Sequence, residues 1–244
     1  MESAAFTRRD PLGGERAREA DARATLSTWT VADPGPLGLA AFALTTFVLS
    51  MFNADLVGAP GEPVVLGLAL AYGGIAQLLA GMWEFRTGNT FGAVAFSSFG
   101  AFWISFWAFV TFFEDKVPKS HLGSTVGLYL IAWGIFTTYM FVASLRTTAA
   151  VSLVFLLLAA TFFLLGAGQA NESKDVIHLG GYFGIATAVA AWYASFAAVT
   201  NSTFGRTLLP VIPLKREPEA AAAGPAAREA STPERETVPD GGRR

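Results

Sequence analysis

The sequence predicts an all-α protein in which six helices cross a membrane as one bundle. Hydrophobic residues make up 52% of the 244-residue chain and charged residues only 15%, whereas about 25% is usual in soluble domains. All 12 charged residues between positions 37 and 200 fall in short gaps between apolar runs. Each run has about twenty residues, the length of a helix that crosses a hydrocarbon core of about 30 Å.

The predicted transmembrane helices occupy positions 37–57, 64–83, 91–113, 122–145, 148–169 and 176–199. Backbone groups in lipid must be hydrogen-bonded within a helix or a closed barrel, and segments of this length favour helices. The connections are short, so consecutive helices are expected to lie antiparallel and side by side. Residues 36–210 are therefore predicted to form one transmembrane domain.

Residues 1–35 and 211–244 are predicted to be disordered tails. The first mixes both signs of charge with Ala, Gly and Pro, and it lacks the apolar stretch of a secretory signal. Residues 215–244 contain 12 charged residues and no aromatic residue, so they bury too little apolar surface to offset the entropy of ordering. We expect both tails to be dispensable for the core activity.

The distribution of basic residues predicts the orientation. With six spans, the two tails share one side of the membrane with the loops that hold Arg86 and Arg146, and 14 of the 17 Lys and Arg residues lie there. The opposite side has only Lys116, Lys119 and Lys174. Because cytoplasmic segments carry the excess of basic residues, both termini are expected to be cytoplasmic.

Several classes of protein are disfavoured by what the spans contain. The chain has no cysteine, which excludes disulfides, thiolate catalysis and cysteine-bound metals. No Lys, Arg or Asp lies in the middle of a span, as a retinal protein, a proton pump or a voltage sensor would need. The two histidines are too far apart in sequence for a zinc motif. We therefore expect neither an enzyme nor a metal or other cofactor, and the net charge of −2 gives no reason to expect nucleic acid.

Asp33 precedes the first helix as an expected N-cap, and two prolines follow it. The string DPGPLGL at 33–39 closely resembles the NPAPLGL signature of the acetate uptake (succinate-acetate permease) family. YGGIAQ at 72–77, GNTFG at 88–92 and FGRT at 204–207 are similar to later parts of that family, in the right order. The family pattern has Asn and Ala where this chain has Asp33 and Gly35, and an ionised Asp only accepts hydrogen bonds.

The resemblance implies a path for acetate, succinate or a related short carboxylate through each protomer, in the plasma or inner membrane. It also implies a ring of protomers, hexameric in the family. The family's apolar constriction matches Phe42, Phe99 and Leu158 in this chain. Movement of the substrate is expected to be either channel-like or proton-coupled. A membrane sensor or scaffold that acts through its cytoplasmic tails is the alternative function.

A pore without fixed cations can hold an anion by backbone amides at helix starts and by uncharged polar side chains. The predicted substrate-binding residues are accordingly Leu37, Gly38, Thr45, Tyr72, Gln77, Asn89 and Thr90. Glu84 and His178 are the titratable candidates for proton coupling, with an interfacial anchor and a loop hydrogen bond as the simpler alternatives.

Glycine pairs at four-residue spacing occur at 88/92, 123/127 and 180/184. Such pairs let helices approach closely, and ordinary packing inside the bundle explains any single pair. Together with the resemblance, the three pairs predict a symmetric homo-oligomer.

Overall fold

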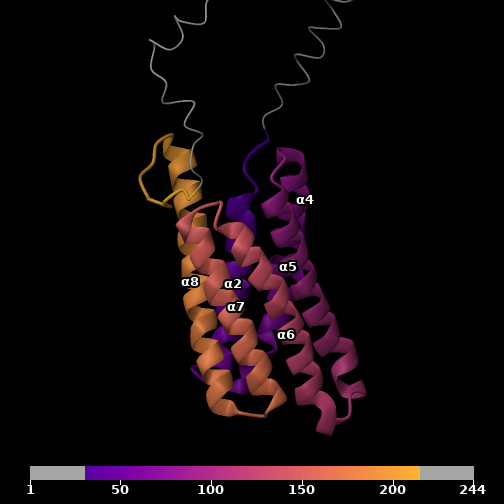
Figure 1. Ribbon diagram of the computed structural model, residues 1–244. Helices are drawn as coiled ribbons and strands as arrows, with labels where there is room; N and C mark the ends of the chain where they lie inside the picture. Colours follow the sequence, from indigo (N-terminus) through magenta and orange to yellow (C-terminus); the bar gives the residue numbers. More distant parts are fainter. Residues whose placement is uncertain (1–30, 215–244) are drawn as a thin grey trace, which may run out of the picture.

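The computed structural model describes residues 31–214, which form a bundle of long helical segments running up and down in sequence order (Figure 1). Six of these segments are long and apolar enough to cross a membrane, so the protein is a multi-pass membrane protein. Both ends of the described chain lie at the same end of the bundle, named the terminal end below. The opposite end, named the far end, holds the loops around residues 54–63, 114–118 and 171–173.

Four spans are single helices: α2 (Gly35–Asn53), α6 (Lys119–Ser144), α7 (Ala149–Ala170) and α8 (Lys174–Phe204). The second span consists of η1 (Ala59–Gly61), α3 (Val64–Leu70), η2 (Ala71–Ala76) and α4 (Gln77–Thr87). The third consists of α5 (Thr90–Ala108), η3 (Phe109–Phe113) and η4 (Glu114–Lys116). These segments confirm the six predicted helices, and the described chain contains no β-strand beyond an isolated Thr148–Pro213 bridge.

Two local features depart from the prediction. The first helix was expected to reach position 57, but α2 ends at Asn53 because the chain turns at Asp55, whose φ is +57°. The second and third spans each contain a π-helical turn, η2 and η3. A π-turn adds one residue to a helical turn and leaves the segment as apolar as before, so the apolar pattern of the sequence does not predict it.

Side chains cap two of the helices as their sequences suggest. Asn89 accepts a hydrogen bond from the Gly92 amide at the start of α5, at 3.1 Å, and Thr148 accepts one from the Val151 amide at the start of α7. At α2 the N-cap is Pro34 rather than Asp33. The Asp33 carboxylate instead accepts from the Gly35 amide, at 2.8 Å.

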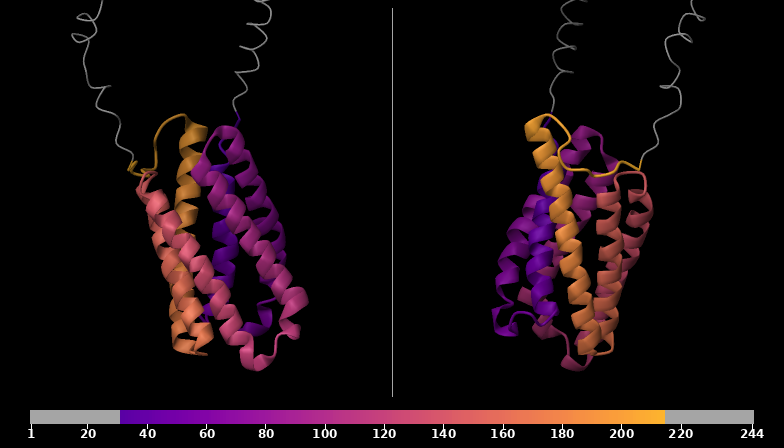
Figure 2. Two further views of the ribbon diagram at one scale, coloured as in Figure 1. Left: turned by 45° about the vertical axis from the view of Figure 1, so that its right-hand side comes forward. Right: turned by 90° about the vertical axis from the view of Figure 1, so that its left-hand side faces the viewer.

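Glycines bring the helices together in four pairs, α2 with α8, α4 with α5, α6 with α7, and α7 with α8. The helices of these pairs run side by side in Figures 1 and 2. A Cβ on Gly181 of α8 would collide with the backbone of α2 at Ala54. A Cβ on Gly81 of α4 would meet the backbone of Ser97, and one on Gly127 of α6 would meet Ala170. The backbones therefore touch directly along these seams.

The contact between α5 and α6 is made differently, by large aromatic side chains. The Phe102 ring lies 5.7 Å from that of Tyr129 and 5.2 Å from that of Trp133, centroid to centroid. Phe99 adds an edge-on contact with Phe136 at 5.4 Å. Rings hold α5 and α6 farther apart than glycine seams would, and this leaves space inside the bundle.

The glycine pairs predicted to join protomers lie against neighbours within the same chain. Gly123 and Gly127 face α7, and Gly184 faces Ser50 of α2 and Thr161 of α7. Gly180 faces Leu165, and Gly92 faces Glu84 and Asn89. Gly88 ends α4 at a φ of +79° and a Cβ on it would meet nothing within 4 Å. Contacts inside the protomer or a helix end therefore account for all six glycines, so these pairs give no separate support for an oligomer.

The chain continues beyond α8 as a strap across the terminal end, formed by residues 205–214. The Asn201 side-chain oxygen accepts from the Leu208 and Leu209 amides, at 2.7 and 3.0 Å. The Leu214 amide donates to the Thr147 carbonyl at 2.9 Å, and the Ala149 amide donates to Ile212 at 2.8 Å. The strap therefore passes position 210, where the transmembrane domain was predicted to end, and the remaining parts of both predicted tails lie outside residues 31–214.

We expect Gly181→Ala to destabilise the protein, because the new methyl group has no room between α8 and α2. Overpacking of this kind costs about 1–3 kcal/mol or more. Gly67→Ala is the matched control, since a Cβ there meets nothing within 4 Å. The yield and thermal stability of detergent-extracted protein measure the difference. Equal stability of the two variants would contradict the direct α2–α8 backbone contact.

Candidate functional site

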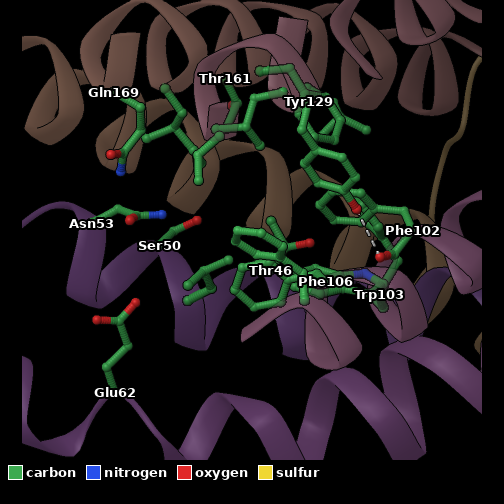
Figure 3. A pocket seen from close by; sticks show the side chains of 18 of the residues that line it. Thr46, Ser50, Asn53, Glu62, Phe102, Trp103, Phe106, Tyr129, Thr161 and Gln169 are labelled. Carbon is green, nitrogen blue, oxygen red and sulfur yellow. Dashed lines mark hydrogen bonds between the residues drawn. The ribbon is translucent and has the colours of Figure 1, made fainter. Parts of the chain in front are cut away.

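A cavity of about 280 Å³, called the large cavity below, lies between α2, α5, α6 and α7 (Figure 3). A water molecule occupies about 30 Å³ in the liquid, so this space is large enough for a small organic molecule. The residues that line it from α2 and α7 follow helical spacing: Phe42, Thr46, Leu49, Ser50 and Asn53, and Leu158, Thr161, Phe162, Leu165 and Gln169. One face of α2 and one face of α7 therefore line the cavity, from the middle of each helix to the far end of the bundle.

The part of this cavity near the far end is polar. Asn53 closes α2, and Gln169 lies in the last turn of α7. Glu62, which precedes α3, lines the same cavity from the second span. Figure 3 shows these three side chains on one side of the space, together with Ser50. Amide, hydroxyl and carboxylate groups thus lie at one end of the cavity.

An aromatic wall forms the other side, from Phe102, Phe106 and Tyr129 (Figure 3). The Tyr129 hydroxyl donates to the Phe102 carbonyl at 3.2 Å and lies 2.7 Å from the Ser105 hydroxyl. Its hydrogen-bonding capacity is therefore used across the α5–α6 contact. This hydrogen bond fixes the ring of Tyr129 as part of the wall.

A second cavity of about 20 Å³ lies nearer the terminal end. Two of its lining residues, Phe42 and Leu158, also line the large cavity. Both are buried. Phe42 and Leu158 therefore form the partition between the two spaces.

The three residues predicted to form a constriction meet at this partition. Phe99 lines the small cavity together with Phe42 and Leu158, and its ring centroid is 5.9 Å from that of Phe42. Phe155 and Phe162 pack against Phe99 at 6.0 and 6.4 Å. The partition is consequently apolar throughout and is supported by further rings.

Gln77 is the polar residue of the small cavity, whose other lining residues are apolar. Its side chain is 1% exposed, and its Oε1 has no hydrogen-bond partner among residues 31–214. Gln77 is the first residue of α4, directly after the π-turn η2. An unpartnered buried amide beside a cavity is suited to bind a polar ligand there.

The other predicted substrate-binding residues lie outside both cavities. Thr45 is buried, and its hydroxyl donates to the Ala41 carbonyl at 2.9 Å. Gly38 packs against the Phe96 ring, and Asn89 caps α5. The structure places Leu37, Tyr72 and Thr90 away from both cavities as well. Gln77 is thus the member of that set that the fold brings to a cavity.

The two titratable candidates also lie apart from the cavities. Glu84 is buried near the terminal end, where its Oε2 accepts from the Thr87 hydroxyl at 3.0 Å. A Cβ on Gly92 would touch its carboxylate, so Glu84 fills the turn between α4 and α5. His178 lies half-buried on α8, near the far end. Within the described chain, no cluster of side chains is arranged to hold a metal ion.

Several residues of the large cavity were not predicted as site residues. They are Trp103, Tyr129, Glu62, Thr161 and Gln169. Helical spacing from Phe42 and Leu158 was the available signal. Positions 46, 49 and 53, and positions 161, 165 and 169, lie on the same faces as those two residues.

Known proteins resemble the chain over most of its length. It is 42% identical over 222 residues to acetate permease A of Emericella nidulans, covering 85% of this chain and 72% of that protein. It is 36% identical over 181 residues to the succinate-acetate/proton symporter SatP of Escherichia coli, covering 74% and 95% respectively. The solved structure of the bacterial acetate channel SatP superposes with a TM-score of 0.68 at 36% identity, and the match covers 75% of this chain and 99% of that one.

A family model described as GPR1/FUN34/yaaH matches residues 18–216. This match and these relatives confirm the family predicted from the sequence motifs. With its six spans and its apolar partition between two cavities, the chain belongs to the GPR1/FUN34/yaaH family.

Proposed function

We propose that the protein moves acetate and related short carboxylates, including succinate, across the membrane through the two cavities. The observation that carries the proposal is their arrangement: the large and small cavities lie on one line along the bundle and meet at Phe42 and Leu158. The relatives named as acetate and succinate-acetate transporters support the choice of solute.

The lining suits a weakly held anion. A carboxylic acid with a pKa of about 4.3 is almost wholly ionised at neutral pH, so it needs donors along its path. Hydroxyl and amide groups line the large cavity and Gln77 lines the small one, whereas no Lys or Arg lines either. Uncharged donors bind an anion less tightly than a fixed cation does, which allows rapid release.

Phe42, Phe99 and Leu158 form the gate of the proposed pathway. Apolar side chains in a narrow passage exclude water and so block conduction until the passage widens. The space beside them is only about 20 Å³ on the terminal side. The size of solute that passes is set at this point.

The terminal end is proposed to face the cytoplasm. Arg86 and Arg146 lie at that end, while Lys116, Lys119 and Lys174 lie at the far end. The basic residues of positions 1–30 and 215–244 add to the terminal side, which agrees with the excess expected in the cytoplasm. The large cavity then faces the outside of the cell.

Channel-like movement is favoured over proton coupling through Glu84 or His178. Neither residue lines a cavity, and the titratable side chains that do are Glu62 and Tyr129. Glu62 lies near the far end, away from the gate. A carboxylate can therefore pass Phe42 and Leu158 without meeting a group that exchanges a proton with it.

Protomers are proposed to assemble as a ring, hexameric as the family resemblance implies. The glycine pairs no longer support this, so the proposal depends on the resemblance and on exposed apolar side chains on α6 and α8, among them Leu128, Ile135 and Phe196. We expect the mass in mild detergent and in native lipid to be a multiple of the 25.8 kDa chain. A monomeric mass in both media would contradict a ring.

Flux of labelled acetate, succinate and lactate into liposomes tests the function, measured with and without a pH gradient. Liposomes with the protein should take up acetate faster than protein-free liposomes. Uptake equal to that of protein-free liposomes would favour the alternative, a sensor or scaffold.

Leu158→Ala should admit bulkier hydroxy acids such as lactate, with acetate flux kept or raised, because it removes three carbons from the gate. If Leu158 only packs the core, the variant should instead lose about 2–5 kcal/mol of stability and all transport. Leu156→Ala is the matched control, since Leu156 lies on the same helix and is 49% exposed. An unchanged lactate-to-acetate ratio at normal yield would remove Leu158 from the pathway.

Glu84→Gln should leave acetate flux largely intact, because Glu84 lies outside both cavities. The amide retains an oxygen that accepts from the Thr87 hydroxyl. The measurement is the initial rate of acetate uptake over a range of external pH. A pH profile that differs from that of the unmodified protein would assign proton coupling to Glu84.

A further inference from the structure

Two buried hydrogen-bond donors line the large cavity without partners in the described chain. Trp103 is 2% exposed and Thr46 is 5% exposed, and both line the cavity. The Trp103 Nε1 and the Thr46 Oγ1 make no hydrogen bond to any residue of 31–214. Figure 3 shows both side chains at the cavity. A buried N–H or O–H in a folded protein normally has a partner, so the partner of these two is expected in the cavity.

Two other hydroxyls of the same cavity bond to the protein itself. The Thr161 hydroxyl donates to the Leu157 carbonyl at 2.8 Å, and the Tyr129 hydroxyl donates to Phe102. A threonine in a helix ordinarily bonds the carbonyl four residues earlier, as Thr45 does. Thr46 does not, and its hydroxyl has no partner among residues 31–214.

Thr46 on α2 and Trp103 on α5 have the same position relative to the gate residue of their own helix. Thr46 follows Phe42 by four residues on α2, and Trp103 follows Phe99 by four residues on α5. Both helices run from the terminal end to the far end (Figure 1). Each donor therefore lies about one helical turn, or about 5.4 Å, from a gate residue on the side of the large cavity.

The chemistry of the pair selects an acceptor. An indole N–H only donates, so it cannot bind a metal ion or another cation through that atom. A threonine hydroxyl can donate to a second oxygen. A carboxylate offers two oxygens that both accept, and hydrogen bonds to an ionised acceptor are the stronger kind. Two unpartnered donors that line one cavity match such a group.

We propose that the Trp103 indole N–H and the Thr46 hydroxyl bind the carboxylate of the substrate in the large cavity, one helical turn before the gate. This subsite rests on the proposed function, and it specifies where the carboxylate of the substrate binds before it passes the gate. Gln77 receives the solute on the other side of Phe42 and Leu158. Uncharged polar groups thus lie on both sides of the gate, and in the small cavity the unpartnered atom is the Gln77 Oε1, an acceptor.

Trp103→Phe and Thr46→Val remove the donors while keeping ring and branched shape. Each should raise the half-saturating acetate concentration for uptake by about tenfold, equivalent to about 1.4 kcal/mol, with a smaller change in the maximal rate. Trp107→Phe and Thr138→Val are matched controls on α5 and α6. Neither residue lines a cavity, and the Thr138 hydroxyl donates to Gly134 at 2.8 Å. Both controls should keep the unmodified value.

Equilibrium binding of acetate to purified protein, measured by calorimetry, separates this proposal from the proposed function. If the protein does not carry acetate but binds it, and both variants bind about tenfold more weakly, the subsite stands and the transport function fails. If transport occurs and both variants keep the unmodified half-saturating concentration, water is the partner of these donors and the subsite is overturned. Should Trp103→Phe extract poorly, Thr46→Val alone decides between these results.

Discussion

Direct contact between helix backbones at glycine sets the dimensions of this bundle. Gly181 fixes α8 against α2, Gly81 fixes α4 against α5, and Gly127 fixes α6 against α7. Lipid gives helices no hydrophobic reason to associate, so close packing of this kind has to hold them together. The α5–α6 contact lacks such a seam and uses rings instead. The large cavity lies between α2, α5, α6 and α7, beside this contact, where rings rather than glycines separate two helices.

The fold was largely predictable because the length and apolar composition of a segment are enough to identify it as a membrane helix. All six spans were found, and capping at Asn89 follows from the residue type. The early end of α2 and the π-turns were not found. Apolar residues continue past Asn53, and the turn at Asp55 depends on a single positive φ that composition does not encode.

The site was predictable only where a motif marked it. Phe42, Phe99 and Leu158 came from the family resemblance, and they do meet in space. Trp103 did not stand out, because helices that face lipid on one side and other helices on the other are apolar all round. Periodicity then fails to show which face points inward. The helix-start residues Leu37 and Thr90 were chosen for their backbone amides, yet both lie at the surface of the terminal end.

The strap of residues 205–214 joins the end of α8 to the connection between α6 and α7 through Asn201 and Thr147. Three consecutive helices are thereby closed into a mechanical unit, linked by the α7–α8 loop at one end and by the strap at the other. Such a unit resists tilting of α8 relative to α6. In the proposed pathway, widening consequently falls to α2 and α5 and to rotation of the rings at the proposed gate, so opening is expected to be a local change rather than a rocking of two halves.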